Sequence, residues 1–181
     1  MPTATCLIFR SMWAGKGKTR ELTELALLTA LVIGGKEAMN VLPNINPVTL
    51  LLLLGTIVYG KKALYVAMTF SLVEIGLYGM GMWAVNYLYV WPLLVLAALP
   101  FRASRSRLFW AAFAGLFGLC FGALCAIPYL FIGGVEMAFG YWISGIPFDL
   151  AHCAGNAALN FVLLLPLSDL VENIRSKQPQ P

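Results

Sequence analysis

The chain has 181 residues, of which 60% are hydrophobic and only 11% are charged, whereas soluble globular domains have roughly 45–50% apolar and about 25% charged residues. This composition, with a mean hydropathy of +0.82, excludes a soluble enzyme and predicts an all-α integral membrane protein. The net charge of +4 does not indicate nucleic-acid binding, because the lysines and arginines stand in short clusters between apolar runs.

Six apolar segments follow a basic N-terminal segment. Residues 1–20 contain no apolar run long enough for a signal peptide, so we expect a cytoplasmic N-terminal tail. Runs of about twenty apolar residues can cross the roughly 30 Å hydrocarbon core as helices. The sequence therefore predicts six transmembrane helices, at 22–41, 47–60, 62–80, 83–101, 108–132 and 147–167. They form one domain over 21–167, and 168–181 are expected to be a cytoplasmic C-terminal tail.

The basic residues orient these six helices. Eleven of the twelve lysines and arginines lie before the first helix, between helices two and three, between helices four and five, or after the last helix. All of these segments are on one side of a six-helix model. Because cytoplasmic segments are enriched in Lys and Arg, both termini are predicted to be cytoplasmic. The connections around 41–47, 80–83 and 132–146 are then outside.

Once the charged residues on the predicted cytoplasmic side are set aside, the other ionisable groups all lie in the predicted outer half. They are Lys36, Glu37, Glu74, Glu136, Asp149 and the single histidine, His152. A charge at the bilayer centre costs about 2.5–3.5 kcal/mol even on lenient scales, so such groups normally face a protein interior or a water-filled cavity. We therefore expect a shared cavity that opens outward. Its excess of acids favours a cationic or hydrogen-bond-donating ligand.

A polar stripe runs along the last predicted helix. Its members follow at intervals of three, four and four residues, which places them on one helix face: Asp149, His152, Asn156 and Asn160. Two interpretations remain open for this stripe, namely contact with a ligand and hydrogen bonding between helices.

A strip of small residues runs along the fifth predicted helix. It consists of Ala111, Gly115, Gly118, Gly122 and Ala126. Such a strip predicts that another helix approaches closely.

Aromatic and amide side chains mark two further places in the outer half. The fourth helix opens with Trp83, Asn86, Tyr87, Tyr89 and Trp91, a pattern typical of a membrane-interface belt and also of a pocket for a flat polar ligand. The connection from Pro43 to Pro47 adds two amides, those of Asn44 and Asn46. This connection suits either a ligand contact or a stiff turn.

Four segments together resemble the substrate-binding S component of energy-coupling factor (ECF) transporters. They are LTELALLTALV, LPNINPVTLLLLLGTIVYGKKALY, NYLYVWPLL and SGIPFDLAHCAGNAALNFVLLLPL. The resemblance covers about residues 21–166 and implies a multi-pass capture subunit in the bacterial cell (inner) membrane for a vitamin or related water-soluble micronutrient. It also implies that Ala26 and Ala30, the AxxxA pair of the first helix, dock on a coupling transmembrane subunit that works with two ATPases.

The resemblance and the polar pattern together define a pool of predicted ligand contacts. The pool is Lys36, Glu37, Asn44, Asn46, Glu74, Tyr78, Asn86, Tyr89, Trp91, Asp149, His152 and Asn156. No cofactor, metal site or nucleic-acid partner is expected, and membrane lipid is the remaining partner. No GxxxxGK[ST] motif is present, so ATP hydrolysis is expected in partner subunits. The alternatives are a self-sufficient carrier or channel and an intramembrane enzyme that uses Glu74, Asp149 and His152 as acid and base.

Overall fold

The computed structural model describes residues 4–41 and 45–177. Within these residues the chain is helical throughout most of its length and has no strand, which confirms the all-α prediction. The long helices are α1 (Ala4–Ala38), α2 (Val48–Tyr59), α3 (Ala63–Tyr78), α4 (Met82–Ala98), α5 (Arg107–Leu159) and α6 (Leu165–Ser176). Short helical elements connect some of them: η1 (Gly60–Lys62), η2 (Leu99–Phe101) and η3 (Asn160–Leu164).

Three helical stretches of the described chain are long and apolar enough to cross a membrane. They are Val48–Tyr78, Met82–Phe101 and Arg107–Ser176. The first stretch joins α2 to α3 through η1, and the third contains α5, η3 and α6. A membrane protein is the class that these lengths and compositions indicate. The six-helix topology and the cytoplasmic position of the termini stay predictions.

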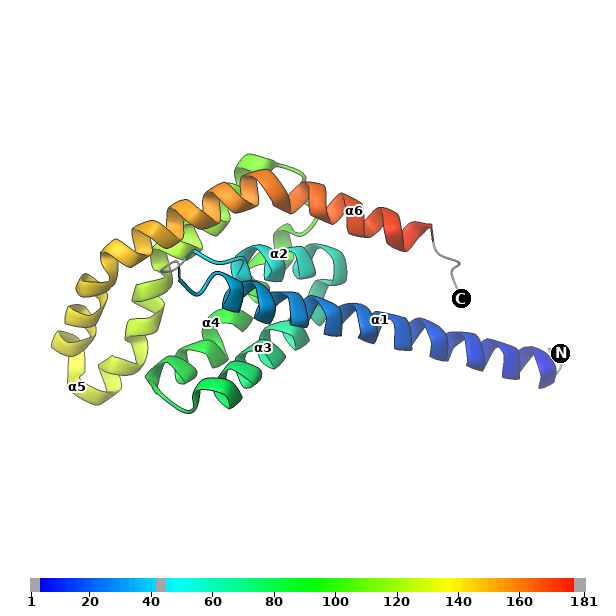
Figure 1. The fold of residues 1–181 in the computed structure, drawn as a ribbon, viewed down its shortest axis with the longest axis horizontal. Coiled ribbons are helices and arrows are strands. Elements are labelled where there is room, and N and C mark those ends of the chain that lie inside the picture. The colour runs from blue at the N-terminus through cyan, green and yellow to red at the C-terminus, as the bar shows by residue number, and fades with distance from the viewer. Residues whose placement is uncertain (1–3, 42–44, 178–181) are drawn as a thin grey trace.

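α5 folds back on itself near its middle. Its helical geometry breaks only at Gly133 and Gly134, and Gly134 has a φ of +73°, which glycine adopts without the steric penalty of other residues. The helix before the break (107–132, the first arm) and the helix after it (135–159, the second arm) run back along each other (Figure 1).

The prediction of a loop over 132–146 is therefore wrong, whereas the outer position of this connection stays a prediction. The second arm starts directly after Gly134 and continues through Pro147 without leaving the helix. The expected helix start at Pro147 assumed that proline ends a helix, but membrane helices tolerate an internal proline because neighbouring groups satisfy the freed backbone.

The strip of small residues packs against the second arm. A Cβ added at Gly118 would lie 2.8–2.9 Å from backbone atoms of His152 and Cys153, and one added at Gly115 would lie 3.3 Å from the Cβ of Ala157. The arms approach so closely that only small side chains fit between them. This confirms the predicted close approach, and the approaching helix is the returning part of α5 itself.

α2 lies inside the bundle. It contacts α1, α3, α4, α5 and α6, and the side chains of Leu52 and Leu53 are completely buried. With 12 residues it is about 18 Å long, shorter than the hydrocarbon core of a bilayer. The short second helix expected from the sequence is thus an internal element around which the others pack.

Several predicted cytoplasmic segments meet at one end of the molecule. Lys62 of η1 pairs with Glu21 of α1 at 2.5 Å, and Arg175 of α6 pairs with Glu24 of α1 at 3.3 Å. The start of α1 and the end of α6 both point away from the bundle at this end (Figure 1). The described parts of both predicted tails are helical, because α1 begins at Ala4 and α6 continues to Ser176.

Candidate functional site

A group of charged side chains joins the end of α1 to α3. Lys36 pairs with Glu37 at 3.0 Å and also with Glu74. The hydroxyl of Tyr78 donates to Glu37, and the Lys36 nitrogen lies 4.7 Å from the centre of the Tyr78 ring. These four residues, the Lys36 cluster, come from the predicted ligand pool, and their two carboxylates share one ammonium group.

A row of rings leads from α3 through α4 to α5. Tyr87 contacts Trp91 with ring centres 5.6 Å apart, Trp91 contacts Phe121 at 5.4 Å, and Phe121 contacts His152 at 4.8 Å. Phe70 of α3 stacks on Tyr87 at 5.8 Å. Trp91 is only 2% exposed, so it is an interior residue and not part of a membrane-interface belt.

The polar stripe of the last predicted helix is buried, as its spacing predicts. Asp149, His152, Asn156 and Asn160 are each at most 3% exposed. Asp149 Oδ1 accepts a hydrogen bond from the Gly122 backbone N–H at 2.9 Å. Part of the stripe therefore holds the two arms of α5 together.

Asn156 also joins the two arms. The side-chain Nδ2 of Asn156 donates to the backbone carbonyl of Ala114 at 3.3 Å. The backbone carbonyl of Asn156 accepts a hydrogen bond of 2.8 Å from Asn160 Nδ2. The interpretation as helix-to-helix hydrogen bonding fits Asn156, which was also in the predicted ligand pool.

His152 and its neighbours have polar atoms that the fold does not use. Within the described residues, both ring nitrogens of His152, Oδ2 of Asp149 and Nε1 of Trp91 are buried without a hydrogen-bond partner. A buried donor or acceptor left without a partner costs about 1–3 kcal/mol. We name Trp91, Phe121, Asp149 and His152 the His152 cluster. It is the strongest candidate ligand site, because a ligand can supply the missing partners.

Other members of the predicted pool have structural contacts. The side-chain oxygen of Asn46 accepts from the Val48 N–H at 3.1 Å, at the start of α2. The Tyr89 hydroxyl bonds to the Leu124 carbonyl at 2.6 Å and to Asn86 at 3.1 Å, which ties α4 to the first arm of α5. Asn44 lies outside the described residues.

Sequence reasoning missed Phe121. It touches both Trp91 and His152 and stands between them in the row of rings. The available signal was its position next to Gly122 in the small-residue strip, since a side chain beside such a strip lies at the edge of the contact between the two arms.

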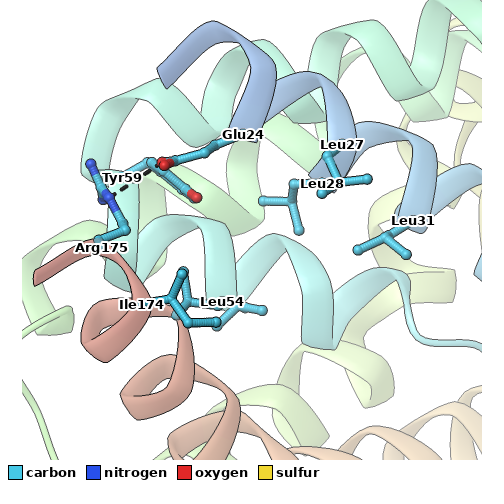
Figure 2. Close-up of a pocket in the computed structure, with 9 residues that line it drawn as sticks. Glu24, Leu27, Leu28, Leu31, Leu54, Tyr59, Ile174 and Arg175 are labelled. Carbon is cyan, nitrogen blue, oxygen red and sulfur yellow. Dashed lines mark ion pairs between the residues drawn. The ribbon is translucent and has the colours of Figure 1, made fainter. Parts of the chain in front are cut away.

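The predicted docking residues lie on an open face of α1. Ala26 and Ala30 are exposed, and Leu27 and Leu31 beside them are 61% and 53% exposed. This face borders a groove between α1 and α6 with α2 as its floor (Figure 2).

The groove combines an apolar floor with a charged end. It has about 600 Å³ of empty space, part of it open to solvent. Leu27, Leu28 and Leu31 face Leu54 and Ile174 across it, and the ion pair of Glu24 with Arg175 closes one end (Figure 2). An apolar groove bounded by a fixed charge pair suits contact with another membrane helix.

Comparison of the chain with family models, curated proteins and solved structures finds no match. The functional interpretation therefore depends on this chain's own geometry. Two features carry it: the His152 cluster in the predicted outer half and the open α1 face at the groove.

Proposed function

We propose that the chain is the membrane-embedded substrate-capture subunit of an ECF-type uptake transporter in the bacterial cell membrane. It binds a vitamin or related micronutrient from outside and transports only together with a coupling subunit and two ATPases. The observation that carries the proposal is the set of buried polar atoms without partners in the His152 cluster.

These atoms fit a binding site better than a packing role. Hydrogen bonding between the arms already has its own groups, Asp149 Oδ1 and the Asn156 amide. Interior polar atoms beyond these lower stability unless something else pairs with them. A small polar ligand between α4 and the arms of α5 supplies those partners, and the neighbouring rings supply surfaces on which a flat molecule stacks.

The open face of α1 supports the docking part of the proposal. The exposed alanines at 26 and 30 leave the helix surface flat, so the backbone of a partner helix can come close. The leucines beside them and the groove next to them extend this surface toward α6. Sequence supports the need for partners as well, because no GxxxxGK[ST] phosphate-binding motif occurs in the chain.

The proposal is tested with the purified chain and with reconstituted vesicles. Mass spectrometry of the chain purified from cells that supply the coupling subunits should detect one small water-soluble molecule bound to it. Vesicles that hold the chain alone should not accumulate this molecule, whereas vesicles that also hold the coupling subunit and ATPases should accumulate it when ATP is present. Accumulation by the chain alone would instead establish a self-sufficient carrier.

A further inference from the structure

The side chains of the His152 cluster that carry partnerless atoms lie beside Phe121 and Gly122 of the first arm. Phe121 contacts Trp91 of α4 on one side and His152 of the second arm on the other. Asp149 lies one helical turn before His152 and is held against Gly122, the residue after Phe121, by a bond of 2.9 Å. The polar atoms without partners therefore belong to side chains that gather around the same short stretch of the first arm.

Each of these atoms has a defined hydrogen-bonding character. The Trp91 Nε1–H only donates, Oδ2 of Asp149 can accept, and the neutral imidazole ring of His152 offers one donor and one acceptor. Among the described side chains, no lysine or arginine forms a hydrogen bond with these atoms. Lys36, the cation predicted in the outer half, already pairs with Glu37 and Glu74.

The structure also separates the four predicted outer acids by their ion-pair partners and their exposure. Of the four predicted outer acids, Glu37 and Glu74 share Lys36, and Glu136 is exposed near the turn between the two arms. Glu74 and Asp149 each keep one buried carboxyl oxygen without a hydrogen-bond partner, but Glu74 has Lys36 as its cation, whereas Asp149 forms no ion pair among the described residues. A ligand that brings a hydrogen-bond donor, or one positive charge, satisfies Oδ2 of Asp149, whereas a carboxylate ligand brings only acceptors and finds no paired cation there.

We infer that the His152 cluster binds a planar nitrogen heterocycle that is neutral or singly positive, with a ring or exocyclic N–H donating to Asp149 Oδ2. A ring acceptor of the same molecule takes the Trp91 N–H, and its face packs on the rings of the row. This inference rests on the proposed capture function. It adds the chemical class of the ligand and names Asp149 as the residue that recognises it.

The test uses the purified full chain in detergent and two sets of probes. One set holds aminopyrimidines and aminopurines, and the other holds pyridine and pyrimidine carboxylates of similar size. Binding is measured by calorimetry. At least one amine-bearing probe should bind, and the carboxylates should not.

The key variant is Asp149→Asn, because its amide oxygen can still accept from Gly122 while its NH₂ group replaces the free acceptor. We expect an affinity loss of about tenfold or more, the equivalent of about 1.4 kcal/mol, with the thermal unfolding midpoint little changed. Asp169→Asn is the matched control, since the side chain of Asp169 is 58% exposed on α6, and its affinity should be unchanged. Trp91→Phe, which keeps a ring but loses the N–H, should also weaken binding.

The outcomes separate the inference from the proposed function. Binding of the carboxylate probes overturns the inference, and so does an Asp149→Asn variant that binds the amine-bearing probe at full affinity. A chain that captures a molecule from cells but binds no amine-bearing probe also overturns it and leaves the proposed function in place. A chain that captures nothing overturns both.

Discussion

Lys36 of α1 forms an ion pair with Glu74 of α3, and the Glu74 side chain is only 1% exposed. The pair ties the end of α1 to α3, just before the connection that leads into α2. Taking two charges out of water is costly, and the loss is recovered only while both partners are present. The stability of this end of the bundle should therefore depend on the pair as a unit.

Replacing one member of the pair should destabilise the protein more than replacing both. Lys36→Met leaves the buried Glu74 carboxylate without its cation, a change that costs about 3–5 kcal/mol in buried pairs. The double variant Lys36→Met/Glu74→Met removes both charges and should recover most of this loss. Thermal unfolding midpoints in detergent measure the effect, with Lys61→Met at an exposed lysine of η1 as control. Equal or greater loss in the double variant would disprove the coupling.

Gly118 should tolerate no side chain. The Cβ of Gly118→Ala would meet the backbone of His152 and Cys153 at 2.8–2.9 Å, and backbone atoms cannot move aside as a flexible side chain can. We expect a destabilisation of about 1–3 kcal/mol, as overpacking usually gives, seen as a lower unfolding midpoint.

The matched control for this variant is Gly140→Ala on the second arm. An added Cβ there meets nothing within 4 Å, and alanine favours a helix over glycine by about 1 kcal/mol. Its midpoint should stay the same or rise. If the two alanine variants behave alike, the arms do not pack as closely as described.

A bulky residue at Ala30 should uncouple transport from binding. Ala30→Trp puts a large ring on the flat face of α1, so we expect at least about a tenfold fall in ATP-dependent uptake, or about 1.4 kcal/mol of docking energy, in vesicles with the coupling subunits. Ligand binding to the purified chain should not change. Leu72→Trp, on the exposed face of α3, is the control and should keep full uptake. Loss of binding with Ala30→Trp would mean that this alanine packs inside the chain.

Cysteine labelling should show that two connections between helices lie on opposite sides of the membrane, as predicted. Met80→Cys lies between α3 and α4, where Met80 is 76% exposed, and Ala103→Cys lies at an exposed position between η2 and α5. In a background with the four native cysteines replaced, a membrane-impermeant maleimide should label Met80→Cys in intact cells. It should label Ala103→Cys only after the membrane is opened. Labelling of both positions from the same side would reject the six-helix topology.

Most of the local structure could be predicted from local patterns. The ends of α2, α3 and α4 fall within a few residues of their predicted boundaries, because Gly and Pro mark breaks in apolar runs. The prediction failed around Pro147, where the same rule marked a break that the helix does not make. A proline inside a packed membrane helix is accommodated by its neighbours, and a single sequence does not reveal which neighbours those are.

The candidate site was predictable only in part. The spacing of Asp149, His152 and Asn156 correctly indicated one buried helix face, but it could not separate the amide that holds the two arms together from the histidine whose nitrogens lack partners. That distinction depends on which atoms of the first arm come within hydrogen-bond distance. Phe121 was missed for the same reason.

The sequence by itself determined an all-helical chain of membrane composition, the polar stripe and the strip of small residues, because all of these follow from composition and from the 3.6-residue period of a helix. Only the tertiary structure decided that Lys36 neutralises Glu74, that Asn156 bonds across the α5 hairpin, and that Trp91, Asp149 and His152 keep free polar atoms around Phe121. The physical reason is that hydrogen bonds and ion pairs join atoms only a few ångströms apart, and the packing of distant segments alone brings those atoms together.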